Sequence, residues 1–223
     1  LDCKVRVRCP LQFTTRHGCS RVTRMRVTVK RPRLTPGHGW CRLSHTMIDL
    51  TAPIADLSKP GNFTHIDLYY RGRRAPDSSL VTRCVLLDLT SGAEGVDVEG
   101  LAGLSRLRSG DSVILQTGWE SYRGTSRYNE SPSVDRRLID RLVDIGVALI
   151  LIDSPGVYGG ARSEEHNAVD QYLADNEAYA VENLVNVRRL TKDRFRLYCF
   201  PVYARERNNA PCRVVADMDA PLD

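Results

Sequence analysis

The chain has 223 residues, of which 42% are hydrophobic and 26% are charged, and its formal net charge at pH 7 is +5. This length and apolar content are enough for one packed domain, with or without an appendage. The longest apolar run is VALILI at 147–152. It is far shorter than the roughly 18 residues that a transmembrane helix needs, so the sequence predicts no membrane span.

Charge is distributed unevenly along the chain. Residues 1–46 hold 11 lysines and arginines against the single acid Asp2, whereas residues 47–223 hold 21 basic residues against 26 acidic ones. This division predicts a basic extension over 1–46, either disordered or foreign to the functional domain, and a compact domain over 47–223. A nucleic-acid-binding arm and an Arg-rich targeting peptide are the alternatives for the extension.

The cysteines follow the same division. Four lie in the extension, without the close pairs that nucleate a structural zinc site, and Cys84, Cys199 and Cys212 lie in apolar runs where thiols pack as small hydrophobes. An odd total of seven, without a C-x-x-C pair, favours a reducing compartment, the cytoplasm, over a disulfide framework. Within the extension, alternating apolar and basic residues predict one strand at 21–30.

From Met47 onward the predicted strands and helices alternate, which indicates an α/β fold. Residues 81–92 and 111–119 are rich in β-branched and apolar residues and end in turn residues, so both are predicted to be buried strands. Between them, leucines spaced by three predict a short helix over 101–107. Further strands are predicted at 147–152, 178–184, 195–203 and 212–218.

Two longer helices are predicted in the second half of the chain. The first begins at Ser131-Pro132, because serine caps exposed amides and proline suits the first turn, and it ends at Gly146. Apolar residues at helical spacing give it one buried face. The second helix begins after Ser163, with two glutamates in a first turn that favours negative charge.

Four residues of the compact domain are good ligands for a divalent metal: His65, Asp67, His166 and Glu182. His65 and Asp67 stand two apart, which places both side chains on the same side of an extended strand. Imidazole and carboxylate together suit zinc or manganese, and a catalytic site needs only about three protein ligands if water fills the remainder. The alternative is structural, a histidine at a strand end that is hydrogen-bonded to a neighbouring aspartate.

Eight segments occur in an order that characterises a known family. The most specific are GDSVILQTGW (110–119) and VENLVNV (181–187), and the others are IDLTAPI (48–54), THID (64–67), VLLDLTSG (85–92), IDSPGV (152–157), EEHN (164–167) and FRLYCFPVY (195–203). In this order they resemble the putative cyclase family, which includes bacterial kynurenine formamidases, isatin hydrolases and some polyketide cyclases. The resemblance covers nearly everything from residue 47 to the C-terminus.

The resemblance implies a swivelling β/β/α fold with a mixed sheet and a metal-binding signature, H-x-G-T-H-x-D-x-P-x-H. His65 and Asp67 match its second histidine and its aspartate, whereas His166 and Glu182 match a later histidine and the glutamate of an E-N-L segment. By the same resemblance, the chain is a metal-dependent hydrolase similar to the kynurenine formamidase (arylformamidase) of tryptophan catabolism. Its substrate is then a small aromatic amide or formamide, and its assembly a homodimer or larger homo-oligomer.

The chain departs from this signature at the site itself. Gly61 stands at the first histidine ligand, Phe63 replaces glycine, Tyr69 replaces proline, and Arg71 replaces the final histidine, which assists proton transfer. Arginine keeps its proton near neutrality, but its guanidinium can bind a substrate carboxylate. Two hypotheses follow: a hydrolase with an altered Zn²⁺ or Mn²⁺ site, or a catalytically impaired relative that acts as a binding or scaffold protein. A degraded signature at 45–49, beginning with His45, is an alternative register.

Overall fold

The computed structural model describes residues 45–54, 63–70, 73–159, 163–203 and 207–222. The strand expected at 21–30, and with it Gly61 and Arg71, lies outside these ranges. A search of the described helices finds none with the length and apolar content required to cross a membrane.

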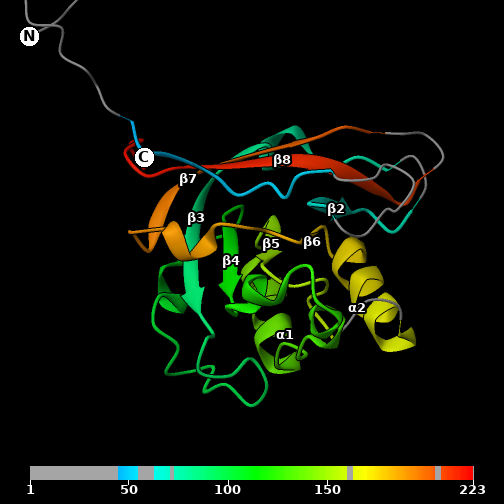
Figure 1. Ribbon diagram of the computed structural model, residues 1–223. Coiled ribbons are helices and arrows are strands. Elements are labelled where there is room, and N and C mark those ends of the chain that lie inside the picture. The colour runs from blue at the N-terminus through cyan, green and yellow to red at the C-terminus, as the bar shows by residue number, and fades with distance from the viewer. Residues whose placement is uncertain (1–44, 55–62, 71–72, 160–162, 204–206, 223) are drawn as a thin grey trace, which may run out of the picture. The chain divides into compact units, whose positions relative to one another are not determined.

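One mixed sheet forms the centre of the described chain (Figure 1). Its strand order is β1-β8-β2-β6-β5-β4-β3-β7, and β7 also pairs with β8, so that seven strands close into a barrel while β1 lies beside β8. Strands β3 to β6 run parallel, and β2, β7 and β8 run antiparallel to their neighbours. The strands are Met47–Asp49 (β1), His65–Asp67 (β2), Val81–Asp88 (β3), Ser112–Gln116 (β4), Leu149–Ile152 (β5), Tyr179–Glu182 (β6), Arg194–Pro201 (β7) and Asn209–Asp217 (β8). The predicted α/β class and mixed sheet are confirmed.

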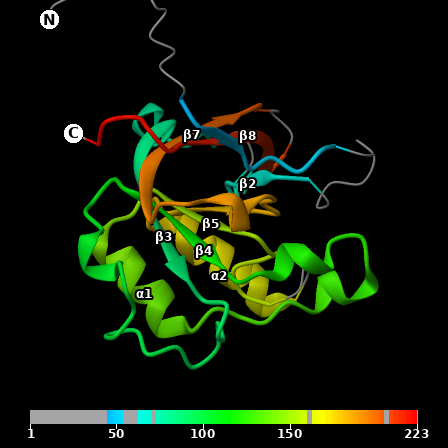
Figure 2. The same ribbon diagram turned by 60° about the vertical axis from the view of Figure 1, so that its left-hand side comes forward.

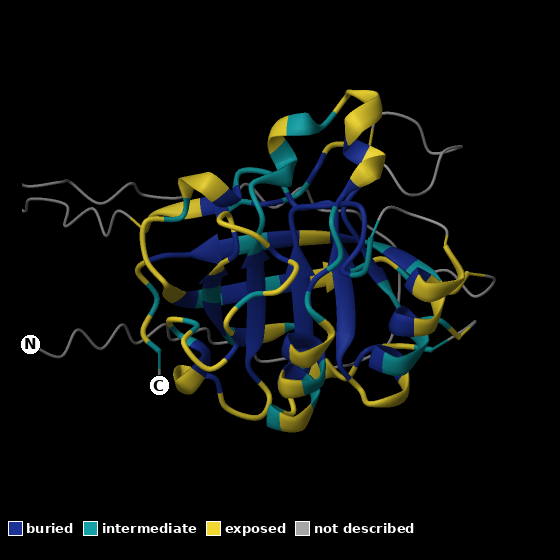
Figure 3. Cartoon of the chain, turned by 90° about the horizontal axis from the view of Figure 1, so that it is seen from below, coloured by how far each residue is buried: buried dark blue, intermediate teal, exposed yellow. Residues whose placement is uncertain are grey.

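Two α-helices, α1 (Arg136–Ile145) and α2 (Glu164–Asp175), lie on the side of the parallel strands that faces away from β7 and β8 (Figures 1 and 2). Alternate residues of β4 therefore face two different cores. Ile114 packs in the interior of the barrel, whereas Leu115 packs in the layer between the sheet and the helices. Figure 3 shows the result: the strands are buried and the outer sides of the helices are exposed.

The helix boundaries confirm part of the sequence analysis and correct the rest. Gly146 ends α1 in the left-handed region at φ 78°, and the Ser163 side chain caps α2 by accepting a hydrogen bond from the His166 amide. The predicted start at Ser131 is wrong, because the Asp135 carboxylate caps the helix instead and Ser133 lies in a β-bridge. The helix expected over 101–107 is reduced to one 3₁₀ turn, η2 (Leu104–Arg106). The other 3₁₀ turns are Asp77–Ser79 (η1), Trp119–Tyr122 (η3), Ser126–Glu130 (η4) and Val187–Arg189 (η5).

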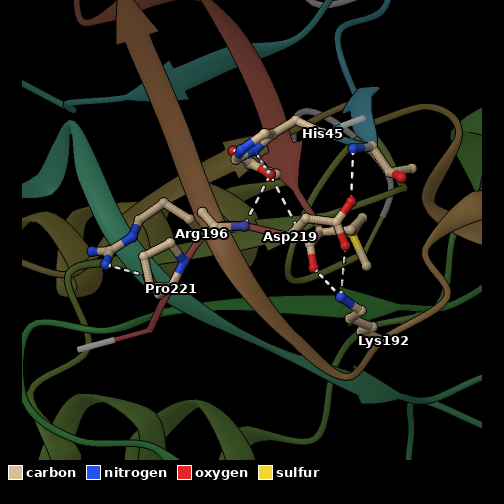
Figure 4. A network of polar contacts seen from close by, with 9 residues as sticks. His45, Lys192, Arg196, Asp219 and Pro221 are labelled. Carbon is tan, nitrogen blue, oxygen red and sulfur yellow. Dashed lines mark hydrogen bonds and ion pairs between the residues drawn. The ribbon is translucent and has the colours of Figure 1, made fainter. Parts of the chain in front are cut away.

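Polar contacts fasten the start of the domain to its end (Figure 4). His45 Nδ1 lies 3.0 Å from Asp217 Oδ2, and the Thr46 amide donates to Asp219 at 2.8 Å. These contacts hold β1 against residues 215–217 of β8, whereas β2 pairs with residues 209–211 at the other end of that strand. The alternative register that begins with His45 is therefore wrong, because His45 lies away from the predicted metal ligands.

Candidate metal centre

Pairing of β2 with β6 brings together three of the predicted ligands. His65 is the cross-strand partner of Glu182, and Asp67 lies on the same face of β2 as His65. His65 Nε2 is 3.3 Å from Asp67 Oδ2 and 3.6 Å from Glu182 Oε2. The other ring nitrogen, Nδ1, lies 2.9 Å from the Phe63 carbonyl oxygen, which can only accept, so Nδ1 carries the proton and Nε2 is free to bind a cation.

Helix α2 completes the cluster from the other side. His166 Nε2 lies 3.9 Å from Glu182 Oε1 and 3.2 Å from Asp170 Oδ2, one helical turn further along α2. The structure thus brings the four predicted residues together and adds Asp170, which the sequence analysis missed. Ligand atoms of His65, Asp67 and Glu182, and likewise those of His166, Asp170 and Glu182, all lie within 4.8 Å of one another.

This cluster has the composition of a cation site. Three carboxylates and two imidazoles share a space in which His65, His166, Asp170 and Glu182 are at most 7% exposed. Asp170 Oδ1 and Glu182 Oε1 are buried without a hydrogen-bond partner among the described residues. Buried charges of one sign are costly unless an opposite charge neutralises them. The residues therefore fit a divalent cation, and their mixed nitrogen and oxygen donors suit Zn²⁺ or Mn²⁺.

Electrostatic effects within the cluster agree with this composition. Burial raises the pKa of the Glu182 carboxyl well above its usual range, and the charges of Asp67 and Asp170 raise it further. Burial also raises the pKa of Asp170, again with a contribution from Asp67. For His65, burial lowers the pKa, but the charge and hydrogen bond of Asp67 outweigh it and raise the pKa to about 9. The contributions of Asp67 and Asp170 to these shifts reflect negative charge that a bound cation would offset, whereas burial lowers the pKa of His166.

Gly156, in the loop after β5, makes room for the second imidazole. A Cβ atom at this position would lie 2.5 Å from His166 Cε1 and 2.6 Å from His166 Nδ1. The Ser154 hydroxyl donates to the Gly156 carbonyl at 2.8 Å and so holds the loop in place. Any side chain at position 156 would therefore force either the His166 ring or the Gly159 carbonyl to move.

A buried chain of hydrogen bonds supports the ligands on β2 and β6. The Thr64 hydroxyl accepts from the Ala52 amide at 2.7 Å and donates to the Asn183 carbonyl at 2.9 Å. The Asn183 amide in turn donates to the Ser154 carbonyl at 2.9 Å, and the Tyr128 hydroxyl donates to Asn183 Oδ1 at 3.1 Å. Because Thr64 precedes His65 and Asn183 follows Glu182, these bonds fix the relative positions of two ligands.

Thr64→Val is expected to lower the free energy of unfolding by about 1–3 kcal/mol, because valine keeps the shape but leaves the buried Ala52 amide without its acceptor. Urea denaturation measures the loss. The matched control is Thr125→Val, which removes an exposed hydroxyl that donates to the Tyr122 carbonyl at 2.7 Å and should cost less than about 0.5 kcal/mol. Equal effects of the two substitutions would show that the Thr64 bonds add nothing specific.

The remaining residues of the altered signature lie close to β2. The Phe63 ring is buried and meets the His65 ring edge-on, with 5.7 Å between the centroids. Tyr69 takes up a left-handed conformation, φ 57°, and packs against the barrel core. Gly61 and Arg71 fall outside the described residues.

Comparisons with known proteins agree with the fold. Residues 43–157, just over half of the chain, match the sequence model of a family described as "Putative cyclase". No curated protein sequence matches the chain.

Solved structures resemble this one along most of its length. A "potential metal-dependent hydrolase with cyclase activity" is 20% identical with a TM-score of 0.63, and the match covers 80% of this chain and 100% of that one. A "predicted metal-dependent hydrolase" from Bacillus stearothermophilus is 21% identical with a TM-score of 0.61, over 78% and 99% of the two chains. Isatin hydrolase A from Labrenzia aggregata is 16% identical with a TM-score of 0.61, over 77% and 93%. At these identities the similarity shows a common fold.

Proposed function

The chain belongs to the putative cyclase family, and from this membership we propose that it is a metal-dependent hydrolase that cleaves the C–N bond of an amide or formamide. The observation that carries the proposal is the convergence of His65, Asp67, His166 and Glu182 from β2, α2 and β6. We further propose a substrate like that of the kynurenine formamidases, a small aromatic formamide such as N-formylkynurenine.

We propose that these four residues hold Zn²⁺ or Mn²⁺, with Asp170 as an additional ligand. Such a cation, when bound, polarises a carbonyl group and lowers the pKa of a water molecule, which is the chemistry that amide hydrolysis needs. The protein contributes geometry to this chemistry: the bond from His65 Nδ1 to the Phe63 carbonyl orients the ring, and Glu182 presents one oxygen to each imidazole. Burial of the two imidazoles keeps bulk water away from the reacting groups.

Further parts of the proposal rest on the sequence. Arg71 stands where the family has a proton-transferring histidine, and we propose that it binds a carboxylate group of the substrate. We also propose that residues 47–223 form the hydrolase domain with residues 1–46 as an extension, that the chain assembles as a homo-oligomer, and that it works in the cytoplasm.

The second candidate function is a binding or scaffold protein that retains the fold without turnover. What favours it is the presence of Gly61 and Arg71 at two positions where the family signature has histidines. In this case the chain keeps the fold without a complete metal shell, because it lacks a histidine ligand and the histidine that assists proton transfer in the family signature.

Metal removal and a formamide assay test the two candidates together. We expect the purified full chain to contain a divalent transition metal, as measured by mass spectrometry, and to hydrolyse N-formylkynurenine. A chelator should abolish the activity and lower the melting temperature, and Mn²⁺ or Zn²⁺ should restore both. Bound metal without turnover favours the second candidate. A folded protein that neither retains nor takes up metal contradicts the hydrolase and favours the scaffold role.

A further inference from the structure

A pocket lies at the opposite end of the parallel strands from the metal centre. Its volume is about 370 Å³, and its lining includes four arginines, Arg83, Arg106, Arg108 and Arg194, with Asp111 as the one acidic side chain. Arg83 is near the start of β3 and Asp111 directly precedes β4, whereas the metal ligand Glu182 ends β6. Because β3 to β6 are parallel, the two sites are separate.

Strand pairing brings two of these arginines, Arg83 and Arg194, close to Arg196, which lies outside the pocket lining. Arg83 on β3 is the cross-strand partner of Arg196 on β7, and Arg194 lies two residues from Arg196 on the same face. Like charges in directly opposed positions destabilise a sheet. The clustering is also unusual for this domain, in which acidic residues outnumber basic ones by 26 to 21 over residues 47–223. An anion bound between the arginines would offset the repulsion.

One guanidinium of the pocket is held in a fixed orientation. Arg83 donates from Nε and Nη2 to both carboxylate oxygens of Asp111, at 2.7–2.9 Å, and Asp111 also accepts from the Arg108 amide at 2.9 Å. The Asp111 side chain is only 5% exposed, so the ion pair is rigid, and both carboxylate oxygens already accept hydrogen bonds from Arg83. Arg83 Nη1 takes no part in this pair and remains available to a ligand.

The other arginines carry most of the unbalanced charge. Arg106 forms an ion pair with Asp193. Arg108 and Arg194 are exposed and have no ion-pair partner among the residues that the structure describes. The C-terminal segment walls the pocket through Leu222, and it is held by the bond from Arg196 to the Pro221 carbonyl and by the pair of Lys192 with Asp219 (Figure 4).

We propose that this pocket binds a phosphate group, either free phosphate or the phosphate of a small metabolite. Guanidinium groups recognise phosphate through paired, charge-assisted hydrogen bonds, and two arginines without partners match the charge of a dianion. The volume suits a compact ligand. The proposal is independent of the proposed hydrolase activity, because no metal ligand lines the pocket.

Calorimetric titration of the full chain with inorganic phosphate, at constant ionic strength, tests the proposal. We expect saturable binding of one phosphate per chain. R108Q/R194Q should weaken it about tenfold or more, because charge-assisted hydrogen bonds are lost. The matched control R189Q/R207Q removes the same charge from exposed positions outside the pocket and should leave the dissociation constant within about twofold.

Two further arms identify the ligand. Repeating the titration with a chelator separates binding in the pocket from binding to a metal ion, and the affinity should not change. Tighter binding of glycerol phosphate than of inorganic phosphate assigns the pocket to a phosphorylated metabolite, and the reverse order assigns it to free phosphate. No saturable binding, or equal binding by the wild type and R108Q/R194Q, would overturn the proposal.

Discussion

Glu182→Gln is expected to lower the affinity for a divalent metal by at least about 100-fold, which exceeds the usual effect of altering a residue that only supports a ligand. The reason is its position: Glu182 Oε2 faces His65 at 3.6 Å and Glu182 Oε1 faces His166 at 3.9 Å, so the substitution damages both halves of the cluster. Glutamine has nearly the same volume and leaves the packing of β6 intact. Titration calorimetry with Mn²⁺ or Zn²⁺ measures the loss.

Stability without metal should change in the opposite direction. Removing one of the two buried carboxylates, which also lies close to Asp67, relieves repulsion, so metal-free Glu182→Gln should unfold at a temperature equal to or above that of the metal-free wild type. Glu99→Gln, which neutralises an exposed glutamate outside the cluster, is the control and should alter neither property. Wild-type metal affinity in Glu182→Gln would mean that the cluster is not a metal site.

Sequence spacing alone could bring together only two of the five residues of this cluster. The two-residue spacing of His65 and Asp67 predicts a shared strand face, and β2 confirms it. Nothing local connects this pair with Glu182, since that contact depends on the antiparallel pairing of β2 with β6. Only the family resemblance joined the two segments. Asp170 was missed because an acid on a helix is ordinary in sequence, although its four-residue spacing from His166 was a usable signal.

Long-range strand pairing also limits how much of the fold the sequence predicts. Apolar runs such as those of β4 and β5 identify buried strands, because local composition decides whether a segment is buried. Closure of the barrel depends on β7 pairing with both β3 and β8, and such long-range partners leave no local pattern. The start of α1 was predicted wrongly for a related reason. Ser131 and Asp135 are both good caps, and only the long-range bridge of Ser133 with Tyr158 keeps the residues before Asp135 extended.

Gly156→Ala is expected to weaken metal binding at least about tenfold and to destabilise the fold by about 1–3 kcal/mol. The added methyl group would lie 2.5 Å from His166 Cε1 and 2.6 Å from the Gly159 carbonyl oxygen, and real Cβ contacts are essentially never so short. Gly156 does not have a positive φ, so alanine brings no backbone strain of its own. The effect must therefore arise from displacement of the imidazole or of the loop around it.

Gly110→Ala is the control that separates the effect of a steric clash from the effect of backbone strain. Gly110 has φ +83°, and nothing lies within 4 Å of the Cβ that alanine would add. This control should therefore cost about 1 kcal/mol of stability and leave metal affinity unchanged. In a double-mutant cycle, Gly156→Ala should lose most of its effect on metal affinity once His166 is already alanine, because both changes remove the same ligand. Additive effects would place the damage elsewhere in the loop and argue against His166 as a ligand.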